Sequence, residues 1–527
     1  MTAEFYSWEE LFMKRIVGRI IFVILGIVLQ VVWYVVCLAI LDKLFFGHLD
    51  DIIRTSFAVM AILFVISLVS KRDESAYKIL WVIVIVALPI LGAILYFLLG
   101  NKKTGKKLKQ KLTKASGELK SQNILVDEKE TDTCIRAIGQ EDLRIAQTLR
   151  KISRTTGFPV VANETSKYYP FGEKMFAEMC EDLRKAEKYI FVEYFIIESG
   201  KFWDTLSGIM AERVRKGVDV RVMYDDFGSI ATYSPKDIRK LKEKGIKCIP
   251  FNPFFSIRSQ LNNRDHRKIM VIDGKVAYSG GVNLADEYIN EVEKFGRWKD
   301  LGIRLTGDSV RSYTYMFAEF WNAFSSDKIH RDLFDDTVKE EVALPDNGYA
   351  LPYYDSPMRS NHTSNEFFTE MLSVATDYAW FYTPYLMLGD ALFDAFIRAA
   401  ERGVDVRLLL PGIPDKPLIF RLATTYFEDL LKAGVKIYEY TPGFVHAKAF
   451  LSDDKIGSIG TVNLDYRSLF LHFECNSIFY KADILKTLKA DYMATLEECR
   501  EVTLDSLNRG KMHRSVNGLL RVAAPLL

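Results

Sequence analysis

The feature that most constrains this chain is an internal repeat that begins at about residue 160. The first copy contains a strand-like run starting at Tyr189, a helical stretch, and the segment Gly217-Val-Asp-Val-Arg-Val. The second contains a strand-like run starting at Ala379, a helical stretch, and the segment Gly403-Val-Asp-Val-Arg-Leu. Short apolar runs that alternate with amphipathic helical patterns are typical of a sheet with helices on its faces. The repeat therefore predicts an α/β fold of two similar domains related by a pseudo-twofold axis.

Each copy then carries a polar motif with the same spacing, His-x-Lys-x4-Asp-x6-Gly-x2-Asn. Its polar members are His266, Lys268, Asp273 and Asn283 in the first copy and His446, Lys448, Asp453 and Asn463 in the second. One His-x-Lys pair alone would carry little information, because most histidines are packing or surface residues. Recurrence of the whole set is improbable by chance, and packing does not require a lysine at that position. These residues are therefore the candidate site.

The spacing also separates the members of each motif. Both motifs have strand composition, and residues two apart on a strand point to the same face. His266 and Lys268 therefore share a face, and the same holds in the second copy. Asp273 and Asp453 lie an odd number of positions away and point to the other side, and Asp273 precedes a glycine in a pair typical of a hairpin turn. We expect these aspartates to support the site rather than to contact substrate.

Two imidazoles that face each other are suited to phosphodiester transfer. One attacks phosphorus and becomes a phosphohistidine, while the other protonates the leaving alcohol and then deprotonates the incoming one. Two lysines and the amides of Asn283 and Asn463 can hold the phosphate and stabilise the transition state. This chemistry requires no metal and no cofactor. The remaining histidines, including His472, lack this context and are interpreted as bystanders.

The paired motifs, over about residues 160–500, resemble the His-Lys-Asp motifs of the phospholipase D superfamily. The resemblance implies a covalent phosphatidyl-histidine intermediate and a mechanism without metal. It suggests His266 as the nucleophile and His446 as the acid/base, and the symmetry of the motif leaves the reverse assignment open. It also implies that a later acidic residue in each half orients a catalytic histidine. The matching positions are Asp300 and Glu474.

Further segments are similar to bacterial cardiolipin synthases within that superfamily. They include Tyr224-Asp-Asp-Phe-Gly-Ser, Thr383-Pro-Tyr-Leu and Asn463-Leu-Asp-Tyr-Arg-Ser. That family joins two phosphatidylglycerol molecules into cardiolipin and releases glycerol. The resemblance therefore implies a phosphatidyltransferase whose partner is phosphatidylglycerol in the membrane.

The first hundred residues contain long apolar runs. Those at 20–41 and 79–100 are each long enough to cross a bilayer as a helix that rises about 1.5 Å per residue. A shorter run at 52–70 is a candidate third span. We expect a membrane anchor at 1–100 with two or three transmembrane helices.

A basic stretch follows the anchor, with eight lysines and one acid, Glu118, between residues 101 and 122. Such a stretch is typical of a solvated helix face, but directly after an apolar span it also indicates a cytoplasmic side and attraction to anionic lipid headgroups. We expect a multi-pass protein of the cell membrane with its catalytic domain on the cytoplasmic side. The predicted order is the anchor at 1–100, a basic linker and lead-in at 101–155, the first repeat at 156–330, and the second repeat with a tail at 331–527.

Three other functions compete with this hypothesis. A phospholipase D, or a transferase that uses another alcohol, would carry the same motifs and differ in whether the pocket admits water. A membrane-tethered nuclease is disfavoured by a formal net charge of only +2, so no nucleic-acid partner is expected. A non-enzymatic membrane scaffold is disfavoured because both motifs are intact.

Overall fold

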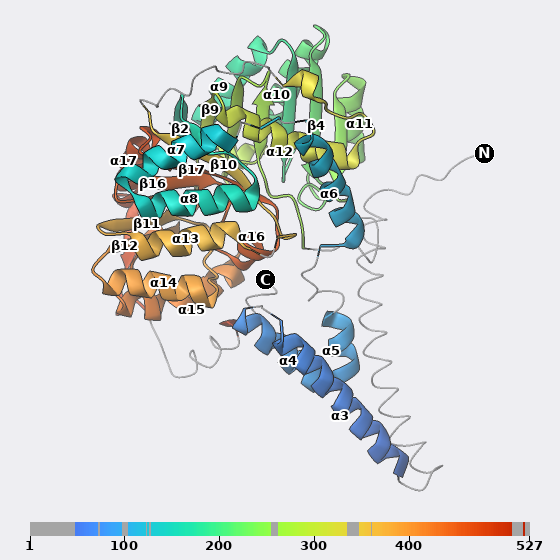
Figure 1. Cartoon of the computed structure of the whole chain (residues 1–527), viewed down its shortest axis with the longest axis vertical. Coiled ribbons are helices and arrows are strands. Elements are labelled where there is room, and N and C mark those ends of the chain that lie inside the picture. Colours follow the sequence, from blue (N-terminus) through green and yellow to red (C-terminus); the bar gives the residue numbers. More distant parts are fainter. Residues whose placement is uncertain are drawn as a thin grey trace, which may run out of the picture. The chain divides into compact units, whose positions relative to one another are not determined.

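The computed structural model describes residues 48–71, 74–96, 104–122, 124–125, 128–253, 262–334, 347–359, 361–507 and 520–521. The chain divides into two compact units (Figure 1). The small unit comprises Met1–Lys102, Phe255–Leu261 and Ser515–Leu527, and the large unit comprises Lys103–Phe254 and Asn262–Arg514.

The small unit contains helices α3 (His48–Val69), α4 (Ser75–Ala87) and α5 (Pro89–Leu95). The apolar run expected to form one span at 79–100 is divided between α4 and α5. The division falls at Leu88–Pro89, because proline lacks a backbone N–H and disfavours helical geometry at the residue before it. Among the described residues, no helix combines the length and the apolar character that crossing a bilayer requires. The span expected at 20–41 lies outside the described residues.

The helices of the small unit pack around aromatic side chains. The rings of Trp81 and Tyr96 lie 5.2 Å apart and nearly perpendicular. Gly92 allows α5 to approach α4, since a Cβ at that position would lie 2.5 Å from the carbonyl oxygen of Val84. The outward-facing side chains are also apolar, and the most exposed include Val59, Ile62, Leu63, Ile66, Ile83 and Val86. A unit surrounded by water rarely exposes so large an apolar surface.

The first half of the large unit is built on a seven-stranded sheet. Its strands, in spatial order, are β2 (Ser166–Tyr169), β9 (Gly302–Thr306), β7 (Val276–Gly280), β6 (Ile269–Ile272), β3 (Tyr189–Tyr194), β4 (Asp219–Asp225) and β5 (Lys247–Phe251). Strands β3, β4 and β5 run parallel, and the other neighbouring strands pair antiparallel. The interior strand β3 is buried along its whole length, as expected for a strand covered on both faces.

The second half contains a sheet of nine strands with the same central arrangement. Its strands, in spatial order, are β1 (Val161–Ala162), β10 (Tyr349–Asp355), β17 (Glu474–Tyr480), β16 (Ile456–Gly460), β15 (Ala449–Ser452), β11 (Tyr378–Tyr382), β12 (Asp405–Pro411), β13 (Lys436–Tyr440) and β18 (Cys499–Val502). Without the edge strands β1 and β18, the order and directions match those of the first sheet strand for strand. The predicted fold of two α/β repeats is confirmed.

Helices cover the outer faces of both sheets (Figure 1). They are α9 (Gly172–Lys185), α10 (Lys201–Val214) and α11 (Pro235–Glu243) in the first half, and α13 (Thr363–Val374), α14 (Asp390–Glu401) and α15 (Pro417–Lys432) in the second. Helix α17 (Ile484–Leu496) contacts strands of the second sheet and also β2 of the first. Helix α12 (Ser309–Phe324) likewise packs against strands of both sheets. Its Phe317 stacks on Phe191 of β3 at 4.6 Å, and its Phe320 meets Tyr354 of β10 at 5.8 Å. The buried helix α12 therefore joins the cores of the two repeats, and α17 makes a second connection through β2.

The segment expected to be a basic linker and lead-in is helical. It forms α6 (Lys106–Lys120), α7 (Glu128–Glu141) and α8 (Leu143–Thr156). Helix α6 packs on α12, whereas α7 and α8 pack on strands of the second sheet. Strand β1 follows α8 and pairs with β10 through Val161 and Ala350. The residues that precede the first repeat thus complete the second.

Two matching hairpins, β6–β7 and β15–β16, turn at Asp273 and Asp453, whose φ angles are 53° and 54°. The Asp273 carboxylate accepts hydrogen bonds of 2.7–2.8 Å from the three backbone N–H groups of residues 187–189, at the start of β3. Asp453 accepts bonds of 2.8–2.9 Å from residues 376–378, at the start of β11. Each aspartate therefore fixes its hairpin to the neighbouring interior strand, β3 in the first sheet and β11 in the second.

Replacing Asp273 with alanine is expected to destabilise the large unit by about 2–4 kcal/mol, because three N–H groups lose a charged acceptor. The turnover of the protein that remains folded should change little. Thermal unfolding in detergent, with turnover normalised to folded protein, measures both effects. The corresponding Asp453→Ala variant should behave alike, and an inactive Asp273→Ala protein of unchanged thermal midpoint would contradict the structural role.

Candidate active site

The two motifs are brought together by short stretches of backbone that cross between the repeats. Strand β8 (Arg297–Lys299) of the first repeat pairs in parallel with β14 (Gly443–Val445) of the second. The His446 N–H donates to the carbonyl of Lys299 at 2.7 Å. In the equivalent place, Asp265 bridges to Phe473, and the His266 N–H donates to the Phe473 carbonyl at 2.9 Å. Each histidine segment is therefore held by the partner repeat.

This crossing exchanges the orienting carboxylates between the repeats. The Nδ1 atom of His266 lies 2.9 Å from Oε2 of Glu474, and Nδ1 of His446 lies 2.6 Å from Oδ2 of Asp300. The carboxylate side chains of both acids have no exposed surface. A carboxylate bonded to Nδ1 fixes the orientation of the ring and favours the imidazolium form, leaving Nε2 for substrate.

The two carboxylates are supported differently. Glu474 accepts hydrogen bonds from the hydroxyls of Thr461 at 2.5 Å and of Ser468 at 2.7 Å, the latter in α16 (Tyr466–Phe470). Asp300 accepts one from the N–H of Leu301 at 2.8 Å. At the position that matches Thr461, the first motif has Gly281, where a Cβ would lie 2.0 Å from Asp300 Oδ1. The glycine is therefore needed for Asp300 to approach.

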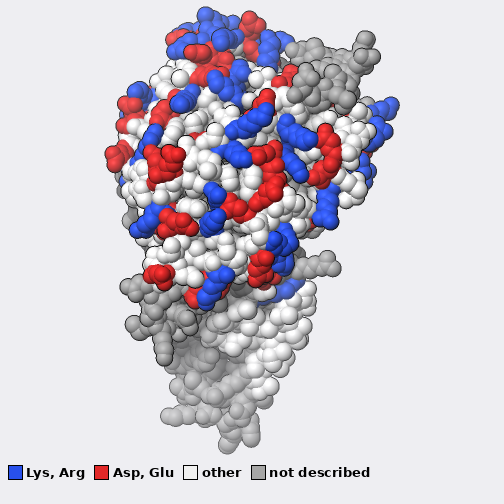
Figure 2. Space-filling view, turned by 90° about the vertical axis from the view of Figure 1, so that its left-hand side faces the viewer, with Lys and Arg blue, Asp and Glu red and all other residues white. Residues whose placement is uncertain are grey.

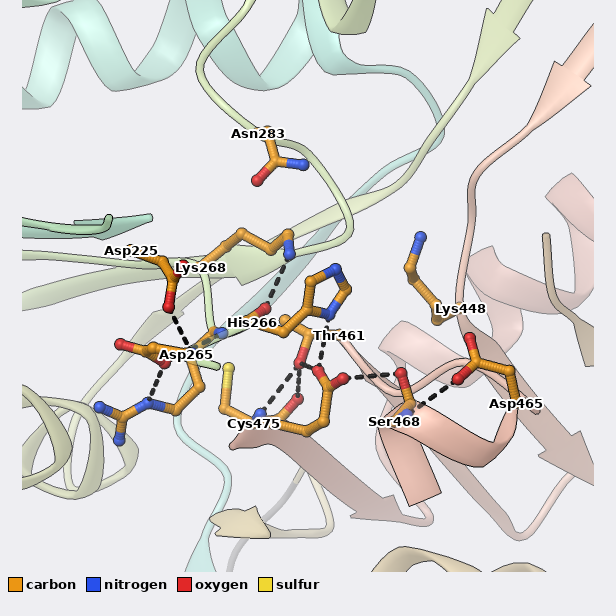
Figure 3. A network of polar contacts seen from close by, with 12 residues as sticks. Asp225, Asp265, His266, Lys268, Asn283, Lys448, Thr461, Asp465, Ser468 and Cys475 are labelled. Atoms are coloured by element: carbon orange, nitrogen blue, oxygen red, sulfur yellow. Dashed lines mark hydrogen bonds and ion pairs between the residues drawn. The ribbon is translucent and has the colours of Figure 1, made fainter. Parts of the chain in front are cut away.

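The lysines lie beside the histidines, as the spacing predicts. Lys268 Nζ donates to the carbonyl of His266 at 2.7 Å, and Lys448 Nζ donates to the carbonyl of His446. In Figure 3, Lys268, Lys448 and Asn283 lie around His266 on the side away from Thr461 and Ser468, whose hydroxyls bond Glu474. The side chains of both lysines are buried, so water screens their charges little and they act on a ligand in the site.

The two asparagines differ in their contacts. Asn283 accepts a hydrogen bond from the Ile196 N–H at 3.2 Å and donates to the Tyr288 hydroxyl at 2.8 Å. Among the described residues, Oδ1 of Asn463 is buried without a hydrogen-bond partner. Asn283 is thus engaged by the protein itself, whereas the unpaired atom of Asn463 is an acceptor oxygen.

Burial sets the charge states of the site. Burial and the nearby lysines hold the pKa of His266 and of His446 well below the ordinary value, which favours the neutral form of each imidazole in the free enzyme. Burial also lowers the pKa of Lys268 to about 8 and that of Lys448 to about 7. It raises the pKa of Asp300 to about 7, against the opposing pull of Lys448. A neutral imidazole is the form that can attack phosphorus.

A buried ionic network flanks the first histidine, and it was not predicted from the sequence. Arg264 Nε lies 3.0 Å from both carboxylate oxygens of Asp225, which also accepts the Asp265 N–H at 2.9 Å. Arg267 donates to Asp265 at 3.0 Å and forms an ion pair with Glu193. These charges are almost completely buried and paired, which holds the His266 segment in one position.

The second histidine has apolar surroundings instead. The neighbours of His446 in sequence are Val445 and Ala447, where the first copy has Asp265 and Arg267. Three aromatic rings lie 5.4–5.9 Å from its ring, those of Tyr288, Trp298 and Phe444. The two halves therefore share a backbone plan but give their histidines different environments.

In the described part of the chain, no group of three or more His, Cys, Asp or Glu side chains is arranged to hold a metal ion.

Two α/β repeats that exchange carboxylates across paired His-Lys motifs define a protein of the phospholipase D fold. Residues 179–294 and 368–495 match a family model described as cardiolipin synthase, PLD-like domain, and residues 57–101 match one described as phospholipase D-nuclease N-terminal. The chain belongs to the cardiolipin synthase family.

Individual relatives agree with this membership. A cardiolipin synthase of Geobacillus sp. is 32% identical over 90% of this chain and 93% of its own length. Cardiolipin synthase 2 of Bacillus anthracis is 30% identical over 89% of this chain and 91% of its own length. An uncharacterised protein of Streptococcus mutans is 42% identical over 88% of this chain and 99% of its own. The crystal structure of a phosphatidylserine synthase from Haemophilus influenzae, with a TM-score of 0.56 and 14% identity, covers 72% of this chain and 100% of its own, and shares the fold.

The charge states predict an alkaline limit on activity. A lysine with a lowered pKa is protonated below that pKa and neutral above it. The kcat/KM for headgroup release should therefore fall as pH rises above about 7–8, when Lys448 and then Lys268 lose the charge that holds phosphate. Arginine stays charged throughout, so Lys448→Arg should move this limb to higher pH at a reduced maximal rate. A pH–rate profile measures this alkaline fall in kcat/KM. If the fall stayed at the same pH in both Lys448→Arg and Lys268→Arg, its assignment to the two lysines would be wrong.

Proposed function

We propose that this protein is a cardiolipin synthase that transfers a phosphatidyl group between two phosphatidylglycerol molecules. The observation that carries the proposal is the pair of crossed dyads, His266–Glu474 and His446–Asp300, beside two buried lysines. Two oriented imidazoles and two cations are what a two-step phosphoryl transfer through a histidine needs. Membership of the cardiolipin synthase family supplies the substrate class.

In the first step, Nε2 of His266 attacks the phosphorus of one phosphatidylglycerol. The bond from phosphorus to the headgroup oxygen breaks, and glycerol leaves with a proton donated by Nε2 of His446, which enters this step protonated, held by Asp300, and leaves it neutral. In the second step, His446 takes the proton of a headgroup hydroxyl on a second phosphatidylglycerol. That oxygen attacks phosphorus, the phosphorus–nitrogen bond breaks, and cardiolipin and free His266 result. Lys268, Lys448 and the amides of Asn283 and Asn463 hold the phosphoryl oxygens.

The surroundings of the two histidines support this division of roles. The ionic network around Arg264 and Arg267 holds the His266 segment rigidly, which suits a nucleophile that must return to one position after each cycle. The aromatic rings beside His446 exclude water from the place where an alcohol must be activated. Asp273 and Asp453 contribute by fixing the hairpins that follow each motif.

We further propose that the small unit anchors the enzyme in the cell membrane, as a multi-pass anchor with the catalytic unit on the cytoplasmic side. The exposed apolar side chains of α3 and α4 support this proposal, because lipid would cover them. On the face drawn in Figure 2, the described residues of the small unit are almost all uncharged, while both signs of charge are mixed over the large unit. A mixed surface gives no support to a nuclease, which needs a basic one.

The central test supplies phosphatidylglycerol to the purified protein with chelator and without any activated lipid. Cardiolipin and glycerol are expected in equal amounts by mass spectrometry. His266→Ala and His446→Ala should each reduce transfer by at least about 10³-fold, because each removes a group that acts in both steps. His330→Ala, at an exposed histidine, is the matched control.

Other products would decide between the alternatives. Phosphatidic acid in place of cardiolipin would make water the acceptor and the protein a phospholipase. A phosphohistidine trapped on His446 rather than on His266 would reverse the two roles. Substantial transfer in either alanine variant would disprove the two-histidine mechanism.

Helix α6 supports a lipid-facing role for the basic stretch. Leu108, Leu112 and Leu119 are buried on the side that packs against α12. The lysines lie on the exposed side of the helix and are Lys106, Lys107, Lys109, Lys111, Lys114 and Lys120. A fixed cationic face of this kind would attract anionic phosphatidylglycerol.

Replacing Lys106, Lys107, Lys109 and Lys114 together with glutamine is expected to raise the apparent KM for phosphatidylglycerol several-fold in bilayers that contain little of it. Lysines near an anionic surface attract its headgroups, and glutamine does not. Turnover in pure phosphatidylglycerol micelles should stay unchanged. The control replaces the exposed lysines of α11, Lys236, Lys240 and Lys242. Equal KM values for the two variants would show that the α6 charge has no role.

A further inference from the structure

We propose that His472 is a third histidine of the active site, and that its Nε2 hydrogen-bonds a phosphoryl oxygen of the lipid while the phosphoryl group is transferred to and from His266. This inference rests on the proposed function, because it assumes that a phosphorus atom occupies the site next to His266. It assigns a role to a residue outside both His-Lys motifs.

The position of His472 is fixed by the same crossing that builds the site. Its ring lies 6.1 Å from the ring of His266, at an interplanar angle of 42°. The residues on either side of it pair with the segment that leads to His266: the Asn263 N–H donates to the Leu471 carbonyl at 2.8 Å, and the Phe473 N–H donates to the Arg264 carbonyl at 2.9 Å. The two imidazoles are therefore held on adjacent, hydrogen-bonded backbones.

The Nε2 atom of His472 has unused hydrogen-bonding capacity. Among the residues that the structure describes, this nitrogen is buried and has no hydrogen-bond partner. A buried polar atom without a partner costs free energy, and at a functional site the usual reason is that a ligand completes it. The His472 backbone is bonded, with its N–H donating to the Arg467 carbonyl at 2.9 Å, so the ring is presented on a fixed support.

The charges around His472 select an anion. Burial and the cations Arg467, Arg264 and Lys268 hold the pKa of His472 well below its ordinary value, so its imidazole is neutral. A neutral imidazole protonated on Nε2 donates one hydrogen bond through that atom. An anionic phosphoryl oxygen accepts such a bond, and Lys268 of the first motif adds a positive charge beside it, whereas Arg264 is already paired with Asp225. The bond involves no proton transfer, so it can serve both the formation and the breakdown of the phosphohistidine.

The equivalent position in the other repeat gives the strongest contrast. His472 stands two residues before Glu474, and Trp298 stands two residues before Asp300. Both rings lie beside the histidine of the partner motif, His472 beside His266 and Trp298 beside His446 at 5.6 Å. At this one position the repeats have an aromatic ring next to the proposed acid/base and a polar imidazole next to the proposed nucleophile, whose ring also meets Phe195 at 5.0 Å. Such a difference is expected if only the His266 side carries the phosphoryl group.

The test compares His472→Leu, which removes the donor, with His472→Gln, which retains an N–H donor on a side chain of similar reach. His330→Leu is the matched control at an exposed histidine. The full-length protein in detergent is given phosphatidylglycerol, and the release of glycerol is followed. Glycerol release reports the attack on phosphorus whether the acceptor is a second lipid or water. A wild-type enzyme that forms phosphatidic acid would therefore revise the proposed function without affecting this test.

We expect His472→Leu to lower kcat for glycerol release by about 10- to 100-fold, the size of one hydrogen bond to a charged group, with KM nearly unchanged. His472→Gln should recover most of that loss, and the thermal midpoint of all variants should stay near that of the wild type. A wild-type kcat in His472→Leu would overturn the proposal. Equal losses in the leucine and glutamine variants, or losses that follow the thermal midpoint, would show that His472 acts only by packing.

Discussion

The rest of the site depends on one constraint, the exchange of carboxylates between the repeats. His266 is oriented by Glu474 of the second repeat and His446 by Asp300 of the first. The exchange follows from backbone pairing, since β8 and β14 run side by side and Asp265 bridges to Phe473. Neither repeat alone contains an oriented histidine. The duplication is therefore a requirement of the chemistry, and α12, packed on both sheets, makes the two repeats one core.

Within this shared plan the two halves have diverged where they meet the substrate. The strand orders match, yet the positions flanking His266 carry buried ion pairs and those flanking His446 carry apolar side chains. Gly281 and Thr461 occupy equivalent positions, and one makes room for Asp300 while the other bonds Glu474. A symmetric scaffold with unlike linings suits a reaction in which one histidine bonds to phosphorus and the other moves protons.

Much of this was accessible from the sequence, and the limits have physical reasons. The doubled α/β pattern was predictable because strand and helix periods are local, and the separation of the aspartates from the histidines followed from strand parity. The exchange of Asp300 and Glu474 between the repeats could not be predicted, because β8 and β14 are too short to leave a periodic signal in the sequence. The network of Asp225, Arg264 and Glu193 joins residues far apart in the chain. His472 was dismissed as a bystander because its neighbour His266 lies on another repeat.

The position of β1 has a consequence for how the chain is made. Helices α7 and α8 and strand β1 are synthesised before the first repeat, yet they pack on the second, which leaves the ribosome last. Their apolar faces have no native partner until β10 has emerged, so the nascent chain must carry them uncovered while the whole first repeat is translated. Closing so long a loop makes folding slow. It also means that a chain cut off before Glu474 lacks β17 and β18 of the second sheet and the acid that orients His266.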